Sequence, residues 1–308
     1  MEYVLQTKAL TKRYRHIEAV RNVNMTIARG DIYGFIGPNG AGKTTIIRIV
    51  TGLAYPSNGS YQLFGTAYND KAINQARRRI SAIVETPSLY QNLSAYENLK
   101  IQCKILGIID HSVIDEILEL VGLGYVRHDK KAVKHFSLGM KQRLGIAMAL
   151  VGNPDFVLLD EPMNGLDPEG IVEIRELIVR LNQEKNITFL ISSHILGELS
   201  KIATKYGFIR HGELIKEITA RQLEQECRKS NEFTVDNVKK AAQVLETELN
   251  ITNYHILNGS IVRIYDEIDI ALVVMQFAKA GILIQKIYSR DENIEEYYLN
   301  LMGGLSDA

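Results

Sequence analysis

The chain has 308 residues, a length typical of two domains, and 46% of them are apolar, which is enough to build sizeable cores. Lysine plus arginine equals aspartate plus glutamate, at 36 each, so the overall charge offers no electrostatic footprint for nucleic acid or an anionic membrane surface. We therefore expect no nucleic-acid partner. No window holds the ~18–20 uninterrupted apolar residues of a membrane helix, so any membrane span would come from another polypeptide.

Residues 1 to about 217 alternate β-rich runs with helical patterns, which predicts an α/β domain around a mainly parallel sheet. The segment from about 87 to 152 is rich in helical patterns and has no strong strand, so we expect a helical subdomain inserted into the α/β core. The strands are expected at 32–36, 80–84, 155–160 and 187–192. The helices are expected at 43–52, 94–106, 110–121, 138–151, 168–184 and 195–203.

Residues 218–308 show a different order of predicted strands and helices and are expected to form a C-terminal accessory domain. A strand at 232–235 and a helix at 237–249 come first. Two strands, 252–257 and 260–265, then flank Asn258-Gly259, a signal for a hairpin turn. A helix at 268–280, a strand at 282–288 and a last helix near 292–301 complete the segment. The order β-α-β-β-α-β is that of a ferredoxin-like unit, which predicts a small α+β domain.

The strand 32–36 runs directly into Gly37-Pro38-Asn39-Gly40-Ala41-Gly42-Lys43-Thr44-Thr45 and then into an apolar helix. This run matches Gly-x-x-x-x-Gly-Lys-[Ser/Thr] in the strand–loop–helix context that the motif requires. Glycines let backbone N–H groups wrap phosphates, Lys43 can reach the β- and γ-phosphates, and Thr44 can ligate Mg²⁺. The loop predicts nucleoside triphosphate binding by residues 37–45. It leaves the reaction open, because kinases, GTPases and ATPases share it.

Two acids follow four apolar residues in the run 156–161, at the end of an expected strand. Because ligands bind at the carboxyl ends of strands in an open α/β sheet, Asp160 is expected to hold Mg²⁺. Glu161 is expected to polarise an attacking water as general base. His194 ends the next expected strand and could sense a γ-phosphate. Each residue could instead be an ordinary solvated strand end, and the phosphate-binding loop upstream favours the functional interpretation.

These motifs, in this order, resemble those of the ATP-binding subunit of an ABC transporter, and the match covers residues 1–217. The phosphate-binding loop resembles the family's Walker A motif, and the run ending in Glu161 resembles its Walker B motif. Asn164-Gly165-Leu166-Asp167 resembles the D-loop, with Asp167 at its end, and His194 resembles the switch histidine. Tyr14 falls where the family stacks an aromatic ring on adenine, although alone it would more often be a packing residue.

Ser137-Leu138-Gly139-Met140-Lys141-Gln142-Arg143 resembles the signature of the family, usually Leu-Ser-Gly-Gly-Gln. Taken alone, Ser137 is an ordinary helix N-cap. Leu138 and Met140 depart from the pattern, whereas Ser137, Gly139 and Gln142 keep it. The resemblance implies that Ser137, Gly139 and Gln142 serve the nucleotide of a second subunit, in a head-to-tail dimer with another copy of the chain or a homologous cassette.

Glu85 stands where the family usually has glutamine. A carboxylate can still bind Mg²⁺ but, while ionised, cannot donate a hydrogen bond to the attacking water. Glu85 is thus a candidate metal-binding and catalytic residue. It could also be a structural acid, with Gln91 as a weaker candidate for sensing the metal. The run from Glu85 to Leu99 resembles the bacitracin-resistance and lantibiotic-immunity branch of the family.

The resemblance implies an ATPase that uses ATP and Mg²⁺ at the cytoplasmic face of the membrane and powers separate transmembrane permease subunits. The branch implies export of, or resistance to, an antimicrobial peptide of the bacitracin or lantibiotic type, and the helical segment 87–106 is the expected docking surface. One rival is a soluble ABC ATPase that acts on ribosomes or nucleic acid, and another is a P-loop kinase or GTPase. The C-terminal domain either stabilises the dimer by packing on the cassette or binds a regulator or partner.

Overall fold

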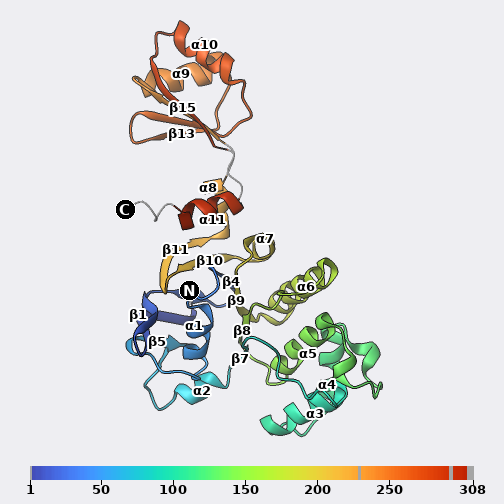
Figure 1. The fold of residues 1–308 in the computed structure, drawn as a ribbon. Coiled ribbons are helices and arrows are strands. Elements are labelled where there is room, and N and C mark those ends of the chain that lie inside the picture. Colours follow the sequence, from blue (N-terminus) through green and yellow to red (C-terminus); the bar gives the residue numbers. More distant parts are fainter. Residues whose placement is uncertain (1, 228–229, 291–293, 304–308) are drawn as a thin grey trace. The chain divides into compact units, whose positions relative to one another are not determined.

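The computed structural model describes residues 2–227, 230–290 and 294–303, and the chain divides into two compact units, Met1–Ala220 and Arg221–Ala308 (Figure 1). Sequence reasoning put the domain boundary at 217–218, within the strand that ends the first unit. The expected last helix at 292–301 begins, within the described residues, at Ile294; residues 292 and 293 lie outside them.

A six-stranded sheet forms the centre of the first unit, in the order β11-β10-β4-β9-β8-β7. Neighbouring strands are parallel except at one edge, where β11 is antiparallel to β10. Every residue of β4 and β8 is buried, as expected for strands covered on both faces. The strands are β4 (Ile32–Ile36), β7 (Ile80–Ile83), β8 (Phe156–Asp160), β9 (Thr188–Ser193), β10 (Lys205–Arg210) and β11 (Glu213–Thr219).

A second, antiparallel sheet precedes and flanks the phosphate-binding loop in the chain, and sequence reasoning missed it. The long strand β1 (Tyr3–Tyr14) pairs with β2, β3 and β5. Register shifts interrupt these pairings near Lys8 and Leu10, and Ala9 has a φ of 48°. The alternation of apolar and polar residues is therefore broken along β1. The remaining strands are β2 (Ile17–Val23), β3 (Thr26–Ala28), β5 (Asn58–Leu63) and β6 (Thr66–Ala67).

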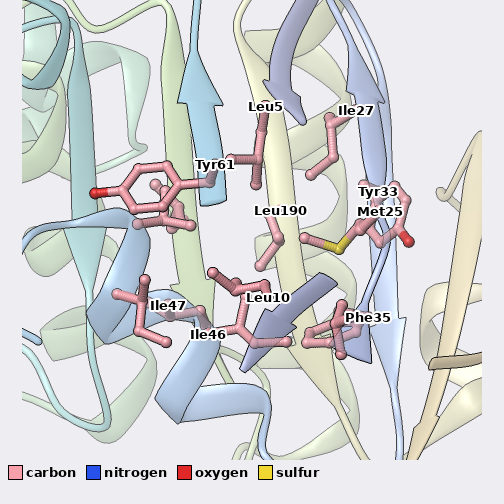
Figure 2. Packing of buried hydrophobic residues seen from close by; sticks show 14 of the residues in the cluster. Leu5, Leu10, Met25, Ile27, Tyr33, Phe35, Ile46, Ile47, Tyr61 and Leu190 are labelled. Atoms are coloured by element: carbon pink, nitrogen blue, oxygen red, sulfur yellow. The ribbon is translucent and has the colours of Figure 1, made fainter. Parts of the chain in front are cut away.

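The main hydrophobic core lies between the antiparallel sheet, the central sheet and α1 (Lys43–Val50) (Figure 2). Leu5 and Leu10 of β1 belong to this core together with Phe35 of β4 and Ile46 of α1, and all four are fully buried. The core thus packs against both elements that flank the phosphate-binding loop, which fixes where the loop begins and ends.

Residues 87–152, where we expected a helical subdomain, contain helices and turns but no strand, and the structure describes this whole range. Ser94 caps α3 in a reciprocal capping box with Glu97, and Gly107 ends this helix with a φ of 73°. The helices are α3 (Ala95–Leu106), α4 (Ser112–Leu120), α5 (Leu138–Leu150) and the 3₁₀ turns η1 (Gly124–Val126) and η2 (Val133–His135).

Three further helices complete the first unit: α2 (Ile73–Arg77), α6 (Pro168–Lys185) and α7 (Leu196–Leu199). The expectation of a helix over 195–203 was wrong in length, because α7 is a single turn. The amides of Ile202 and Ala203 both donate to the carbonyl of Leu199, so the chain turns there. It then enters β10, which sequence reasoning had not placed.

The second unit contains a four-stranded antiparallel sheet in the order β13-β14-β12-β15, with α9 and α10 on one face (Figure 1). Phe233 of the sheet and Phe277 of α10 meet edge to face in its core. Asn258 and Gly259 both have positive φ, as a two-residue hairpin turn requires. The elements are α8 (Ala220–Cys227), β12 (Ser230–Val235), α9 (Val238–Glu248), β13 (Tyr254–Leu257), β14 (Ile261–Ile264), α10 (Ile270–Lys279), β15 (Ile284–Arg290) and α11 (Ile294–Gly303). From β12 to β15 the topology is that of a ferredoxin-like unit.

Candidate functional site

The loop between β4 and α1 contains glycines at positions where any side chain would clash with the backbone or strain it. A Cβ on Gly37 would lie 2.2 Å from the carbonyl oxygen of Ile209, and one on Gly42 would lie 2.5 Å from that of Ala19. Gly40 and Gly42 also have φ values of 79° and 110°. Gly42 is the N-cap of α1 and provides no side-chain acceptor, so the first amides of this helix can bind an anion.

Lys43 is buried at the mouth of this loop, with 5% of its side chain exposed. Its Nζ donates to the carbonyl oxygens of Gly37 and Pro38, at 2.6 and 3.2 Å. The same Nζ lies 3.1 Å from Oε1 of Glu161. The ammonium group therefore joins the loop to the acid that follows β8.

Asp160 at the end of β8 is almost fully buried and accepts two hydroxyl hydrogen bonds. Thr44 Oγ1 donates to its Oδ2 at 2.7 Å, and Ser192 Oγ donates to its Oδ1. Ser192 lies directly opposite Asp160 in the parallel pairing of β8 and β9. Sequence reasoning did not include Ser192. A serine directly after three buried apolar residues, 189–191, was the available signal, because a buried hydroxyl needs a partner.

Glu161 follows with a φ of 51°, in the left-handed region. Its amide donates to the carbonyl and hydroxyl oxygens of Ser192, at 3.2 and 3.0 Å. Its carboxylate lies between two cationic or polar groups, with Oε1 beside Lys43 and Oε2 2.7 Å from Nδ1 of His194. An ionised carboxylate only accepts, so in this contact Nδ1 carries the proton. A strained, doubly held acid at a strand end is typical of a functional site.

The segments that follow β7 and β8, together with the starts of α1 and α5, line one cleft of about 510 Å³. It gathers residues that the sequence analysis had taken from separate motifs: Thr44, Glu85, Gln91, Gln142, Asp160 and Glu161. Among the residues that the structure describes, no three His, Cys, Asp or Glu side chains lie together as a metal site. Mg²⁺ at nucleotide sites typically needs only one or two carboxylates plus phosphates and water.

Glu85 lines this cleft, but its carboxylate contacts another element. Arg48 of α1 donates through Nη2 to Oε1 of Glu85 at 2.6 Å, a contact that sequence reasoning missed. Glu85 has a φ of 64° and 64% of its side chain is exposed.

The other expected site residues lie outside the residues that line the cleft. Ser137 is exposed and caps α5, accepting from the amide of Met140 at 3.2 Å. Asp167 is exposed and caps α6, accepting from the amide of Gly170. Gly139 has room for a methyl group, since a Cβ would lie 3.9 Å from its nearest neighbour, Leu166. Tyr14 is 43% exposed at the end of β1, with Nζ of Lys12 4.9 Å from its ring centroid.

Comparison with known proteins decides the family. A model of the ABC transporter family matches residues 20–164. The chain is 42% identical to the bacitracin transport ATP-binding protein BcrA of Enterococcus faecalis, over 99% of this chain and 98% of the relative. The chain belongs to the ABC transporter ATP-binding proteins.

As a member of this family the chain is an ATPase that powers a transporter, as the sequence resemblance predicted. It is also 46% identical to the lantibiotic transport ATP-binding protein SrtF of Streptococcus pyogenes, over 70% of this chain and 90% of that one. A solved dimer of the ATP-binding cassette MJ0796, bound to ADP and Pi, matches with a TM-score of 0.63 and 26% identity. It covers 70% of this chain and 99% of that chain, so the α/β cassette fold is confirmed.

The match with BcrA extends through the C-terminal unit, because it spans nearly the full length of both chains. Within the described ranges, the ABC ATPase has no helix that is long and apolar enough to cross a membrane.

Proposed function

We propose that the ABC ATPase binds ATP with its triphosphate on residues 37–45 and its adenine against Tyr14. The free amides at the start of α1 and the ammonium of Lys43 supply positive potential for the β- and γ-phosphates. In the structure Lys43 bonds to carbonyl oxygens of the loop. Phosphate oxygens would replace these neutral carbonyl acceptors, because the ammonium group of Lys43 forms stronger hydrogen bonds with a charged acceptor.

Mg²⁺ fits the donor set that the cleft offers. The hydroxyl of Thr44 and the carboxylate of Asp160 already touch, at 2.7 Å, and both are the hard oxygen donors that Mg²⁺ prefers. These two residues would hold the ion, with Glu85 as the third candidate. Held there, Mg²⁺ would supply positive charge that offsets the negative charge developing on the phosphates.

Glu161 is proposed as the general base that takes a proton from the attacking water. The observation that carries this proposal is the position of its carboxylate, held by Lys43 on one oxygen and by His194 on the other. The contact with Lys43 points the acid at the group that would bind the γ-phosphate. As an imidazolium, His194 would donate from Nδ1 to Glu161 and from Nε2 to a phosphate oxygen, whereas in the neutral ring with Nδ1 protonated Nε2 is an acceptor.

Ser137, Gly139 and Asp167 are proposed to act on the nucleotide of a second cassette. All three lie on exposed or half-exposed loop-to-helix junctions and none lines the cleft of its own chain. Ser137 caps α5, so the residue would present the positive end of this helix to a γ-phosphate across the dimer. The dimeric state of the cassette bound to ADP and Pi supports this arrangement.

The permease is proposed to dock in a groove of about 480 Å³ beside α3. The groove is lined by residues of β7, α3 and α5, and Leu53 and Leu106 at its edges are 71% and 48% exposed. Thr86 and Pro87 line both this groove and the nucleotide cleft, so one short segment contacts both sites. The complex would hold the ATPase at the cytoplasmic face of the membrane.

The transported substrate is proposed to be a peptide antibiotic of the bacitracin or lantibiotic type, because BcrA and SrtF carry these names. The test expresses the chain with the permease genes and measures resistance to bacitracin and to a lantibiotic. Wild-type protein should raise resistance, and Glu161→Gln should abolish the gain at equal protein level. Resistance that persists in the variant, or co-purification with ribosomes in place of a membrane protein, would overturn this assignment.

A further inference from the structure

Arg48 and Thr44 lie one helical turn apart on α1, so their side chains share one face of the helix. Thr44 contacts Asp160 at the proposed metal position, whereas Arg48 contacts Glu85. One turn of helix spans about 5.4 Å, which a glutamate side chain can cover by a change of rotamer. Glu85 therefore has two possible partners along the same helix face, a guanidinium and a divalent cation.

Both partners need the same carboxylate. The guanidinium bonded to Oε1 holds the carboxylate one helical turn away from the proposed metal position, and a cation placed next to Mg²⁺ repels it. We propose that Arg48 is a positioning residue that competes with Mg²⁺ for Glu85 and thereby sets the Mg²⁺ concentration at which nucleotide is bound. The inference rests on the proposed role of Glu85 toward the metal.

The exposure of the pair suits such an exchange. The side chains of Arg48 and Glu85 are 43% and 64% exposed, so their ion pair is strongly solvated and stabilises the fold little. A buried pair would be too costly to break. Glu85 is also held in the left-handed region, and Thr86 and Pro87 after it line the permease groove. A change of partner at Glu85 would thus act on the backbone that leads to the groove.

The test measures binding and not turnover, in a chain that also carries Glu161→Gln to prevent hydrolysis. A fluorescent ATP analogue is titrated at increasing Mg²⁺, and Mn²⁺ binding is followed separately by electron paramagnetic resonance. Arg48→Gln should lower the half-saturating concentration of either ion about two- to fivefold, as expected for loss of a solvated ion pair. Arg48→Lys, which keeps the charge, should give a smaller shift, and thermal melting checks that each variant folds.

Glu85→Gln separates this inference from the function on which it rests. This substitution alone should raise the half-saturating concentration, and adding Arg48→Gln should then cause no further decrease. If Glu85→Gln has no effect, the metal role of Glu85 is wrong. If Glu85→Gln has its effect but Arg48→Gln shifts binding equally in both backgrounds, or not at all, the competition is wrong and the pair is only structural.

Discussion

His194 lies with Nδ1 2.7 Å from Oε2 of Glu161, and this contact joins the ends of the neighbouring parallel strands β9 and β8. The other carboxylate oxygen of Glu161, Oε1, lies beside the ammonium group of Lys43 at the end of the phosphate-binding loop. Three elements that are far apart in the sequence therefore hold one carboxylate. The same contacts that orient Glu161 tie its position to whatever occupies the loop.

Replacing Glu161 by glutamine should leave ATP binding intact and reduce hydrolysis by about 10²–10⁴-fold, because an amide cannot accept the proton of the attacking water. The measurements are steady-state phosphate release and equilibrium binding of ATP. The exposed acid Glu169 on α6 offers a matched control, and Glu169→Gln should hydrolyse ATP at the wild-type rate. Near-normal turnover of Glu161→Gln would contradict the assignment of the general base.

His194 should act through Glu161 and the γ-phosphate, so its effects should not add to those of Glu161. His194→Ala should slow hydrolysis in the wild-type background but cause little further loss in the Glu161→Gln background, as expected for residues that work as a unit. The comparison needs only single-turnover rates for four proteins. Independent, multiplicative losses would show that the contact at 2.7 Å has no role in catalysis.

Four of the six strands of the central sheet, and the polar residues that follow them, could be predicted from the sequence, because each of these strands is a short apolar run with a clear end; β10 and β11 were not predicted. Strand β4 led into the phosphate-binding loop, and β8 led into Asp160 and Glu161. The antiparallel sheet could not be predicted in the same way, since the pairings of β1 shift register and break its alternation. Short strands such as β6, with two residues, carry too little pattern to detect.

Partners within the site were harder to predict than the site residues themselves. Glu85 stood out because it replaces a glutamine, but Arg48 is one of many arginines and looks like a solvated charge on an amphipathic helix. Ser192 likewise reads as part of a strand. The contacts of Arg48 and Ser192 follow from the parallel alignment of β7, β8 and β9 beside α1, which determines which side chains lie next to one another.

Gly139→Ala should make α5 more stable and the enzyme less active. Alanine is a better helix former than glycine by about 1 kcal/mol, and the added Cβ has no neighbour closer than 3.9 Å within the chain. A methyl group would instead occupy space near a γ-phosphate across the dimer. A melting temperature that is raised or at least not lowered, unchanged ATP binding and reduced turnover would agree with a role in trans. Full turnover would show that Gly139 does not approach the second nucleotide.

Ser137→Ala isolates the capping role at the same helix end. It removes the acceptor for the amide of Met140 and should cost about 1 kcal/mol of stability. Ser137→Arg should in addition abolish hydrolysis while sparing ATP binding. If Ser137→Arg lowers stability no more than Ser137→Ala and leaves turnover unaltered, Ser137 is only a helix cap.

The acidity of Glu97 should make α3 sensitive to low pH. Hydrogen bonds from the amide and then the hydroxyl of Ser94 lower the pKa of this carboxyl from its ordinary value of 4.5. A depressed pKa contributes stability above the unfolded value, and this contribution is lost as pH falls through the folded pKa. The difference in melting temperature between wild type and Glu97→Gln should therefore be constant at neutral pH and shrink below pH 4.5. A difference that does not change with pH would contradict the capping-box assignment.

The C-terminal unit has a core of its own, so we expect it to unfold while the cassette stays folded. Phe233 is fully buried and meets Phe277 of α10 at 5.8 Å between ring centroids. Phe233→Ala should destabilise this unit by about 3–5 kcal/mol. In the full chain, calorimetry should show a transition at lower temperature for residues 221–308, while ATP binding and hydrolysis remain.

The same variant tests the role of the C-terminal unit. Loss of permease co-purification in this variant would make the unit a partner-binding module. Loss of dimer formation or of soluble protein would instead make it a support for the cassette, and a single cooperative transition would contradict its independence.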